Sequence, residues 1–286
     1  MFILAKRNVL IYFKDRAGVL FSLLSVLIVI ALFVLFLGDN LTSYYEYVVE
    51  DASVVINYWI FAGILGVASV TTTLAAFSVM MNDKVHKTNK DFYTSPIQKS
   101  RIVAGYALGA FFVGSIMSII IFIILIMYGA LIGDQMMSAL TILKVLAVLL
   151  FSVMLNAFML FFMTTFIKTS QAFNAISTIM GTLIGFLMGI YVPIGSLPTS
   201  VQRIIQFFPQ SHITMLFRQF FLEGISEDAF YSVELFEYFR ESMGVVYVIN
   251  DSQFTRLGSV LFLGVSALCF LILSIWRASK SMSSTK

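Results

Sequence analysis

The sequence predicts an all-α integral membrane protein with six transmembrane helices. Only 12% of its 286 residues are charged, whereas about a quarter of a soluble domain is charged. Hydrophobic residues make up 59% of the chain. Six apolar stretches each reach the roughly 20 residues that a helix needs to cross a bilayer core. We place the six spans at Ala17–Leu37, Tyr58–Met81, Ile102–Ile132, Thr141–Ile167, Ala172–Val192 and Leu257–Trp276.

The segments on either side of this six-span domain (residues 17–276) are short. The apolar run that starts at Ala17 is too long for a signal peptide. Residues 1–16 mix basic and apolar side chains, so we predict an amphipathic helix that lies in the membrane interface. Residues 277–286 form a predicted cytoplasmic tail.

The basic residues predict the orientation, because Lys and Arg gather on the cytoplasmic side of membrane proteins. With the N-terminus inside, the cytoplasmic side holds thirteen basic and three acidic residues, and the other side five basic and twelve acidic. Both termini and the loop after the second span are therefore predicted to be cytoplasmic. Trp59 and Trp276 are predicted to lie at the outer and inner interfaces, respectively.

The cytoplasmic segment of residues 82–101 is longer than a connection requires. It reads as a short polar helix that ends near Ser95, because the residue before a proline disfavours helical geometry. Two interpretations stay open: a solvated basic loop, or a helix on which a cytoplasmic protein docks. The candidate docking residues are Asp83, Lys84, His86, Lys87, Lys90, Asp91 and Tyr93.

The outer segment of residues 193–255 is predicted to contain a broken helical hairpin and a small helical cap. Val201, Ile204, Ile205 and Phe208 fall on one helical face, and Pro209 is expected to end that helix. A second piece over 213–222 is too short to span, and Ser211 is expected to cap it. The two pieces form either a re-entrant hairpin or two amphipathic helices on the outer surface.

The spans are predicted to hold no catalytic, cofactor or metal site. No ionisable residue lies near the centre of any span, which counts against a carrier driven by protons or sodium. The sequence lacks a Gly-Lys dipeptide and therefore a Walker A motif. His86 and His212 are expected on opposite sides of the membrane, and Cys269 is the single cysteine. Energy for uphill transport would therefore have to come from another chain.

Small and hydroxyl-bearing residues instead mark the second and fifth spans. Gly181, Gly185 and Gly189 repeat every four residues, a spacing that favours close helix packing, either within the chain or at a seam between two copies. Hydroxyl groups in membrane helices usually bond to their own backbone, but they also suit a path for an amphipathic substrate. The candidate pathway residues are Thr72, Thr73, Asn174, Ser177, Thr178, Thr182 and Phe186.

The whole layout resembles the membrane subunits of type-2 ABC exporters, a family of drug, polysaccharide and lipid permeases. Two local patterns add to the resemblance. The stretch Asp91–Arg101 with Gly105-Tyr106 is similar to the family's entry to its third span. Val192-Pro193, Leu197-Pro198 and the stretch Phe207–His212 are similar to its proline-marked outer hairpin.

The resemblance implies a non-enzymatic transport subunit. Two copies of the permease, expected to be identical, would pair around a path between the second and fifth spans. Two separate ATP-binding subunits, which hold the ATP and Mg²⁺, would dock on the helices at 83–93 and drive an amphipathic or hydrophobic substrate outward. The expected location is a bacterial plasma membrane, with lipid and no nucleic acid as further partners. An ATP-independent carrier or scramblase, or a membrane sensor or immunity protein, is the alternative.

Overall fold

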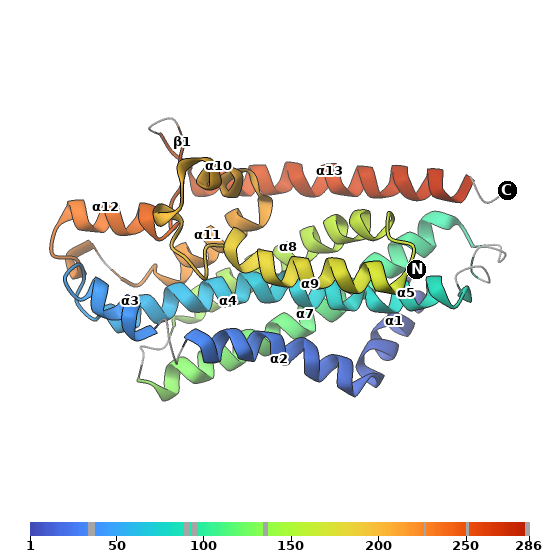
Figure 1. Ribbon diagram of the computed structural model, residues 1–286, viewed down its shortest axis with the longest axis horizontal. Coiled ribbons are helices and arrows are strands. Elements are labelled where there is room, and N and C mark those ends of the chain that lie inside the picture. Colours follow the sequence, from blue (N-terminus) through green and yellow to red (C-terminus); the bar gives the residue numbers. More distant parts are fainter. Residues whose placement is uncertain are drawn as a thin grey trace.

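The computed structural model describes residues 1–33, 38–88, 92, 97–133, 137–225, 227–249 and 252–283. These residues are almost entirely helical, apart from a small antiparallel hairpin of β1 (Val248–Ile249) and β2 (Ser252–Gln253). Figure 1 shows a bundle of long helices, with both termini at one end and helices α3 (Gly38–Tyr45) and α12 (Val233–Ser242) at the other.

Four of the described helices are long and apolar enough to cross a membrane. They correspond to the predicted second, third, fourth and sixth spans. The second is the longest, because its helix continues with only a turn at Phe77 and includes the first four residues of the predicted cytoplasmic segment, 82–85. Their bounds are α4 (Ala52–Ala76) with α5 (Ser78–Val85), α7 (Lys99–Leu131), α8 (Ala139–Thr164) and α13 (Arg256–Ser283).

The predicted first span, Ala17–Leu37, corresponds to the second of two helices that meet at a bend, and its residues 34–37 lie outside the described residues. α1 (Phe2–Lys14) and α2 (Arg16–Leu32) meet at Asp15 with an angle of 77°, and together they form a fifth candidate span. Asp15 begins α2 as its N-cap, because its carboxylate accepts a hydrogen bond from the Gly18 backbone N–H at 3.0 Å. α1 is thus a separate helix, and its place in the membrane interface remains a prediction.

The predicted fifth span is shorter than expected. α9 (Ser170–Leu187) begins at Thr169, whose hydroxyl accepts from the Ala172 N–H at 3.2 Å. It ends five residues before Val192 in a Schellman motif, in which Gly189 takes a φ of +62° and the Ile190 N–H donates to Gly185 O at 2.9 Å. With 18 residues, α9 is about 27 Å long. It does not meet the criterion of length and apolarity that the four helices meet, so a count of six spans remains a prediction.

The two pieces of the predicted outer hairpin lie in different environments. α10 (Thr199–Phe207) rests on the surface and buries only Ile205. α11 (Pro209–Phe221) is buried along almost its whole length and packs against α4, α8 and α13. α10 ends at Phe207, just before Pro209, as predicted. Pro209 also begins α11, since its missing N–H would have no partner in the first turn. The expected Ser211 cap is wrong: its hydroxyl donates to Ile205 O and Phe208 O across the joint.

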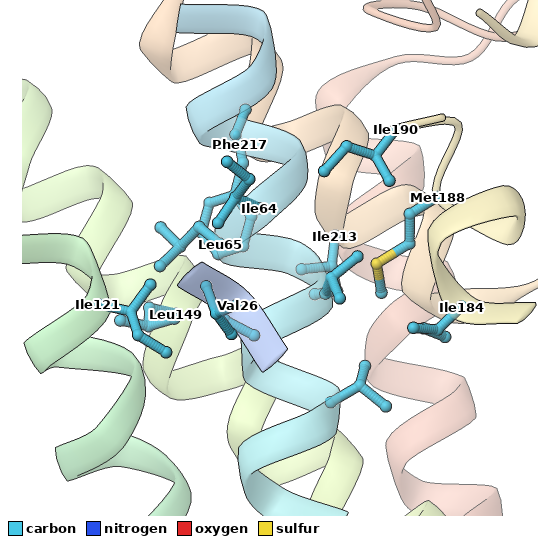
Figure 2. Close-up of a cluster of buried hydrophobic side chains, with 14 of the residues drawn as sticks. Val26, Ile64, Leu65, Ile121, Leu149, Ile184, Met188, Ile190, Ile213 and Phe217 are labelled. Carbon is cyan, nitrogen blue, oxygen red and sulfur yellow. The ribbon is translucent and has the colours of Figure 1, made fainter. Parts of the chain in front are cut away.

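The hydrophobic core is built around α4, which lies between the other helices. In α4, 89% of the most apolar stretch is buried within the protein, whereas in α13 only 22% is, so most of α13 is available to lipid. Figure 2 shows Ile64 and Leu65 of α4 in the middle of the cluster. Around them gather Val26 of α2, Ile121 of α7, Leu149 of α8, Ile184 of α9, Met188 and Ile190 beyond α9, and Ile213 and Phe217 of α11.

Close helix packing uses the glycines of α7. A Cβ atom at Gly109 would lie 2.9 Å from the Asn8 Cβ, and one at Gly105 would lie 2.8 Å from a methyl group of Leu4. These two glycines, spaced by four, therefore let α1 approach α7 closely. The remaining short elements of the fold are the 3₁₀ turns η2 (Ile194–Ser196) and η3 (Glu227–Ala229).

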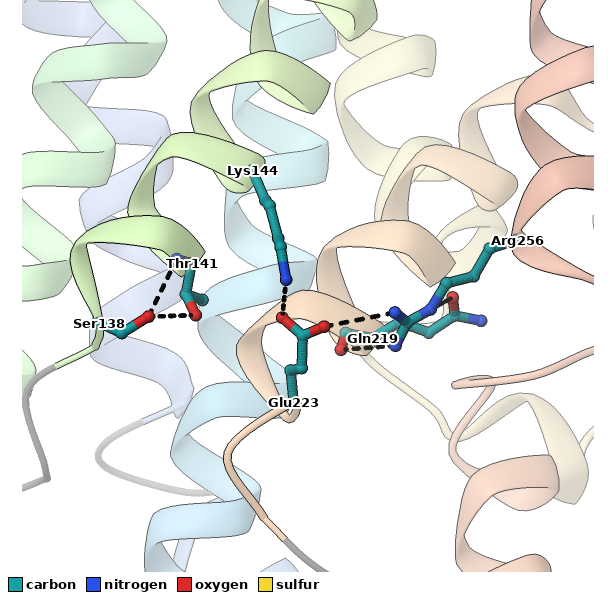
Figure 3. Close-up of polar contacts among 6 residues, drawn as sticks. All are labelled: Ser138, Thr141, Lys144, Gln219, Glu223 and Arg256. Carbon is teal, nitrogen blue, oxygen red and sulfur yellow. Dashed lines mark hydrogen bonds and ion pairs between the residues drawn. The ribbon is translucent and has the colours of Figure 1, made fainter.

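An ionic network joins three helices at the end of the molecule away from the termini (Figure 3). The Glu223 carboxylate lies 2.7 Å from Lys144 Nζ of α8 and 3.4 Å from Arg256 Nη1 of α13. Arg256 Nε also donates to Gln219 Oε1 of α11 at 3.0 Å. The hydrogen bond from Lys144 lowers the pKa of the Glu223 carboxyl below its usual value. The network thus holds the end of α11 to α8 and α13.

We predict that Glu223 stabilises the fold at neutral pH and not in strong acid. Its folded-state pKa is lowered, so its contribution is present above the pKa of an unfolded glutamate, about 4.3, and disappears as the pH falls through the lower folded value. Thermal unfolding at pH 7 and at pH 3 measures this. Glu223→Gln should lower the melting temperature at pH 7 and lower it less at pH 3. The exposed Glu50→Gln is the control, and an equal loss at both pH values for Glu223→Gln would contradict the assignment.

Candidate functional site

A groove of about 480 Å³ lies between α2, α4 and α9. Its walls are largely apolar, and none of its lining residues is charged. Hydroxyl groups from all three helices interrupt the apolar surface, and the ring of Tyr191, which follows α9, closes one side. The hydroxyl-bearing lining residues are Ser22, Thr71, Ser177, Thr178, Thr182 and Tyr191.

The threonines of the groove use their protons on their own helices. Thr71 donates to Val67 O at 3.1 Å, Thr178 to Asn174 O at 3.0 Å and Thr182 to Thr178 O at 3.0 Å. Their oxygen lone pairs stay available as acceptors. Ser177 Oγ is buried and has no hydrogen-bond partner among the described residues. The groove can therefore hold an uncharged amphipathic molecule, with its apolar part against the walls and its polar part hydrogen-bonded to a few hydroxyls.

Thr72 and Thr73 point away from this groove. Both are fully buried, and they donate to Ala68 O at 2.7 Å and to Ser69 O at 2.6 Å. The Thr72 hydroxyl also lies 3.1 Å from Ser118 Oγ of α7. Of these two predicted pathway residues, Thr72 therefore joins α4 to α7 and Thr73 bonds within α4, whereas Thr71 faces the groove. The three consecutive threonines gave no sequence signal that distinguishes them.

The outer face of α9 carries a polar stripe. Asn174, Thr178 and Thr182 repeat every four residues and are exposed, and Phe186 is 46% exposed on the next turn. Nothing lies within 4 Å of a Cβ atom built at Gly181. Amide and hydroxyl groups face lipid at a cost, so a surface of this kind is suited to a second chain or to a polar path.

The three glycines predicted to form one packing stripe behave differently. Gly185 is covered by the Tyr191 ring of the same chain, to which a Cβ atom would approach within 2.2 Å. Gly189 lies outside α9 and forms its C-terminal turn. The expectation of one helical stripe is therefore wrong for Gly189, because only glycine adopts its positive φ without strain. Gly181 alone remains open on the α9 surface.

At the end where the termini lie, a buried ion pair connects three helices. Arg7 of α1 contacts Asp83 of α5 through both Nη atoms, at 2.7 and 2.8 Å. The Tyr106 hydroxyl of α7 donates to the same carboxylate at 2.7 Å. The Asp83 side chain is only 9% exposed. This predicted docking residue is thus occupied inside the chain and presents no free charge to a partner.

The other predicted docking residues are divided. Lys84 donates to Ile167 O beyond the end of α8, which holds its ammonium group against the bundle. His86 and Lys87 are exposed, and Lys87 adopts a φ of +62° in the turn after α5. Lys90, Asp91 and Tyr93 lie outside the described residues. The exposed cation next to the end of the long α4–α5 helix is therefore Lys87.

A buried arginine, which the sequence reasoning did not single out, holds the break between α9 and α11. Arg218 of α11 is fully buried and donates to Met188 O at 3.0 Å and Gly189 O at 2.9 Å. Its guanidinium lies over the Trp59 ring, 4.6 Å from the centroid. Trp59, which was predicted to lie at the outer membrane interface, is fully buried within the protein, and its Nε1–H donates to Met243 O at 2.7 Å. The sequence feature that could have pointed to Arg218 is its position as the single cation in the apolar stretch 213–222.

These features define a helical membrane protein with an uncharged groove between its helices. In a comparison with known protein families, the family model described as ABC-2 family transporter protein matches residues 44–276 of this chain. The chain therefore belongs to the ABC-2 transporter family, which confirms the resemblance noted from the sequence. A search of curated proteins gives no match. Members of this family are transmembrane subunits, usually without their own ATPase site, and an ABC ATP-binding chain is their general partner.

We predict that Asp83→Asn destabilises the protein by about 2 kcal/mol, because the change removes a hydrogen-bonded charge and leaves Arg7 without its counter-charge. The solvent-exposed third of Arg7 keeps the loss below that of a fully buried pair. Thermal unfolding in detergent measures the effect. The double variant Arg7→Gln/Asp83→Asn should be less destabilised than Asp83→Asn. Glu237→Gln, in the exposed pair with Arg240, is the control and should change stability by less than about 0.5 kcal/mol. Equal effects of Asp83→Asn and Glu237→Gln would contradict the assignment.

Proposed function

We propose that this chain is the membrane-spanning half of an ATP-driven exporter that moves an amphipathic or hydrophobic substrate outward across a bacterial plasma membrane. The observation that carries the proposal is the uncharged, hydroxyl-bearing groove between α2, α4 and α9 in a chain of the ABC-2 family. The apolar part of a bound substrate would leave water and contact the groove walls, and the hydroxyls would orient its polar part. The termini face the cytoplasm in this proposal.

Two copies are proposed to pair through α9. The exposed stripe of Asn174, Thr178 and Thr182 would then face the partner's stripe or a shared path, and not lipid. Gly181, with no neighbour within 4 Å, supports this because it leaves room for a partner helix. If the two copies pair in this way, the groove of each copy would open toward the seam between them. Thr178 and Thr182 support this, because they belong both to the groove and to the exposed stripe.

The energy is proposed to enter at the end of α5. Lys87 and His86 are exposed there, next to a helix that runs from this end through the core to Ala52. An ATP-binding subunit that docks at this point would push on α5, and the Arg7–Asp83 pair would transmit the movement to α1. The bend at Asp15 would then let α1 and α2 move relative to each other.

The opposite end is proposed to release the substrate. α11 would be a re-entrant helix, because it is enclosed by α4, α8 and α13 while α10 stays on the surface. Arg218 connects α11 to the last carbonyls of the α9 turn. A movement of α9 would therefore carry the hairpin with it and open the outer side of the groove.

The test is transport of a fluorescent amphipathic dye into inside-out proteoliposomes that contain the full chain with its copurified ATP-binding subunit. We expect transport with MgATP and none without it. Lys87→Glu should lower transport and the subunit's ATPase activity several-fold, since the change reverses the exposed charge at the docking end. Arg203→Glu, an exposed site on α10, should change neither. Dye movement by the chain alone without nucleotide would instead support a carrier or scramblase, and dye binding without movement a sensor.

Cysteine cross-linking tests the α9 seam. In a Cys269→Ser background, Gly181→Cys on the open face of α9 should form a disulfide-linked dimer in membranes, because two seam residues would approach within disulfide distance. Val260→Cys, on the exposed face of α13, is the matched control and should stay monomeric. The measurement is the share of dimer on non-reducing gels. A dimer from Val260→Cys, with none from Gly181→Cys, would place the seam on α13 and overturn the proposal.

A further inference from the structure

A second cavity lies between α7, α8 and α13, away from the groove described above. Its volume is about 750 Å³. Its walls are almost wholly apolar and come from Leu108 and Phe111 of α7, Met154 and Phe158 of α8, and Leu271 of α13. It shares no lining residue with the groove between α2, α4 and α9.

Small side chains leave this space between the helices. Ala104 and Ala107 of α7 and Ala157 of α8 line it where larger residues would fill it. α13 is held to α8 by the Ser274 hydroxyl, which donates to Phe158 O at 3.0 Å, but it meets α7 much less closely. The cavity is therefore a slot between α7 and a helix that otherwise faces lipid.

One charged side chain stands at the mouth of the slot. Arg101, in the first turn of α7, lines it together with Ser100. Its side chain is exposed and takes part in none of the ion pairs among the described residues. Arg101 lies in the first turn of α7, and Met1 lines the same part of the slot, so Arg101 is at the end of the molecule that is cytoplasmic in the orientation proposed above.

We infer that this slot binds an anionic phospholipid of that leaflet, with an acyl chain between α7, α8 and α13 and the phosphate at Arg101. The apolar walls match a hydrocarbon chain and offer it few polar groups. The exposed Arg101 guanidinium at the mouth matches a negative headgroup, because a basic residue at the membrane surface favours an anionic lipid by about 1 kcal/mol. The bound lipid fastens α13 to α7. The inference depends on the membrane location and not on transport.

Native mass spectrometry of the full-length protein, titrated with phosphatidylglycerol or phosphatidylcholine of equal chain length, tests it. We expect phosphatidylglycerol to bind about fivefold more tightly, the equivalent of one basic contact. Arg101→Gln should remove that preference. Arg16→Gln, an exposed arginine that does not line the slot, is the control and should retain it.

The acyl-chain part is tested by filling the slot. Ala107→Leu should weaken binding of both lipids, whereas Ala130→Leu, on the exposed face of the same helix outside the slot, should not. Melting temperatures of all four variants in lipid-free detergent establish that they fold. Equal binding of the two lipids by the wild type, or an Ala107→Leu variant that binds as the wild type does, would overturn the proposal. Loss of dye transport with unchanged lipid binding would count against the exporter assignment alone.

Discussion

The break between α9 and α11 leaves backbone carbonyls inside the protein, and the fold depends on how they are bonded. A helix that ends away from water must find partners for its last C=O groups, since each unpaired group costs several kcal/mol in an apolar setting. Arg218 supplies two of these partners, at Met188 O and Gly189 O. Its own charge is spread over three carbonyls and the face of Trp59. The short α9, the buried α11 and the start of α4 are therefore held at one point.

The two ends of the bundle are fastened by different means. At one end, Arg7, Asp83 and Tyr106 form a compact buried set that joins α1, α5 and α7. At the other, the partly exposed Glu223 network joins α8, α11 and α13. The buried set depends on specific geometry and the exposed network on charge that salt and pH weaken. The middle of the bundle, around Ile64 and Leu65 of α4, has no ionic contact among the described residues and relies on packing.

The groove and the proposed lipid slot have similar apolar walls but different polar groups. Both are largely apolar spaces between three helices. The groove carries hydroxyls and no charge, which suits a ligand that must also leave. The slot has the exposed Arg101 at its mouth and walls that are otherwise mainly apolar, which suits a ligand that stays. In the proposals made above, the groove takes the cargo and the slot takes a membrane lipid, and the two spaces share no lining residue.

Composition and periodicity determined that this chain crosses a membrane, and they located four of its spans, because a long apolar run has one stable environment whatever surrounds it. The order of spans and proline-marked turns was also enough to identify the family. The sequence could not determine which face of α4 carries Thr71 and which carries Thr72, because consecutive threonines look alike until neighbouring helices are placed. It could not show that Asp83 is bound by a residue 76 positions away, that Gly189 ends α9, or that Arg218 closes the break. The Asp83 and Arg218 contacts join distant segments, and only the packed bundle decides them, whereas the Gly189 turn is local but has a glycine repeat that also fits a helical stripe.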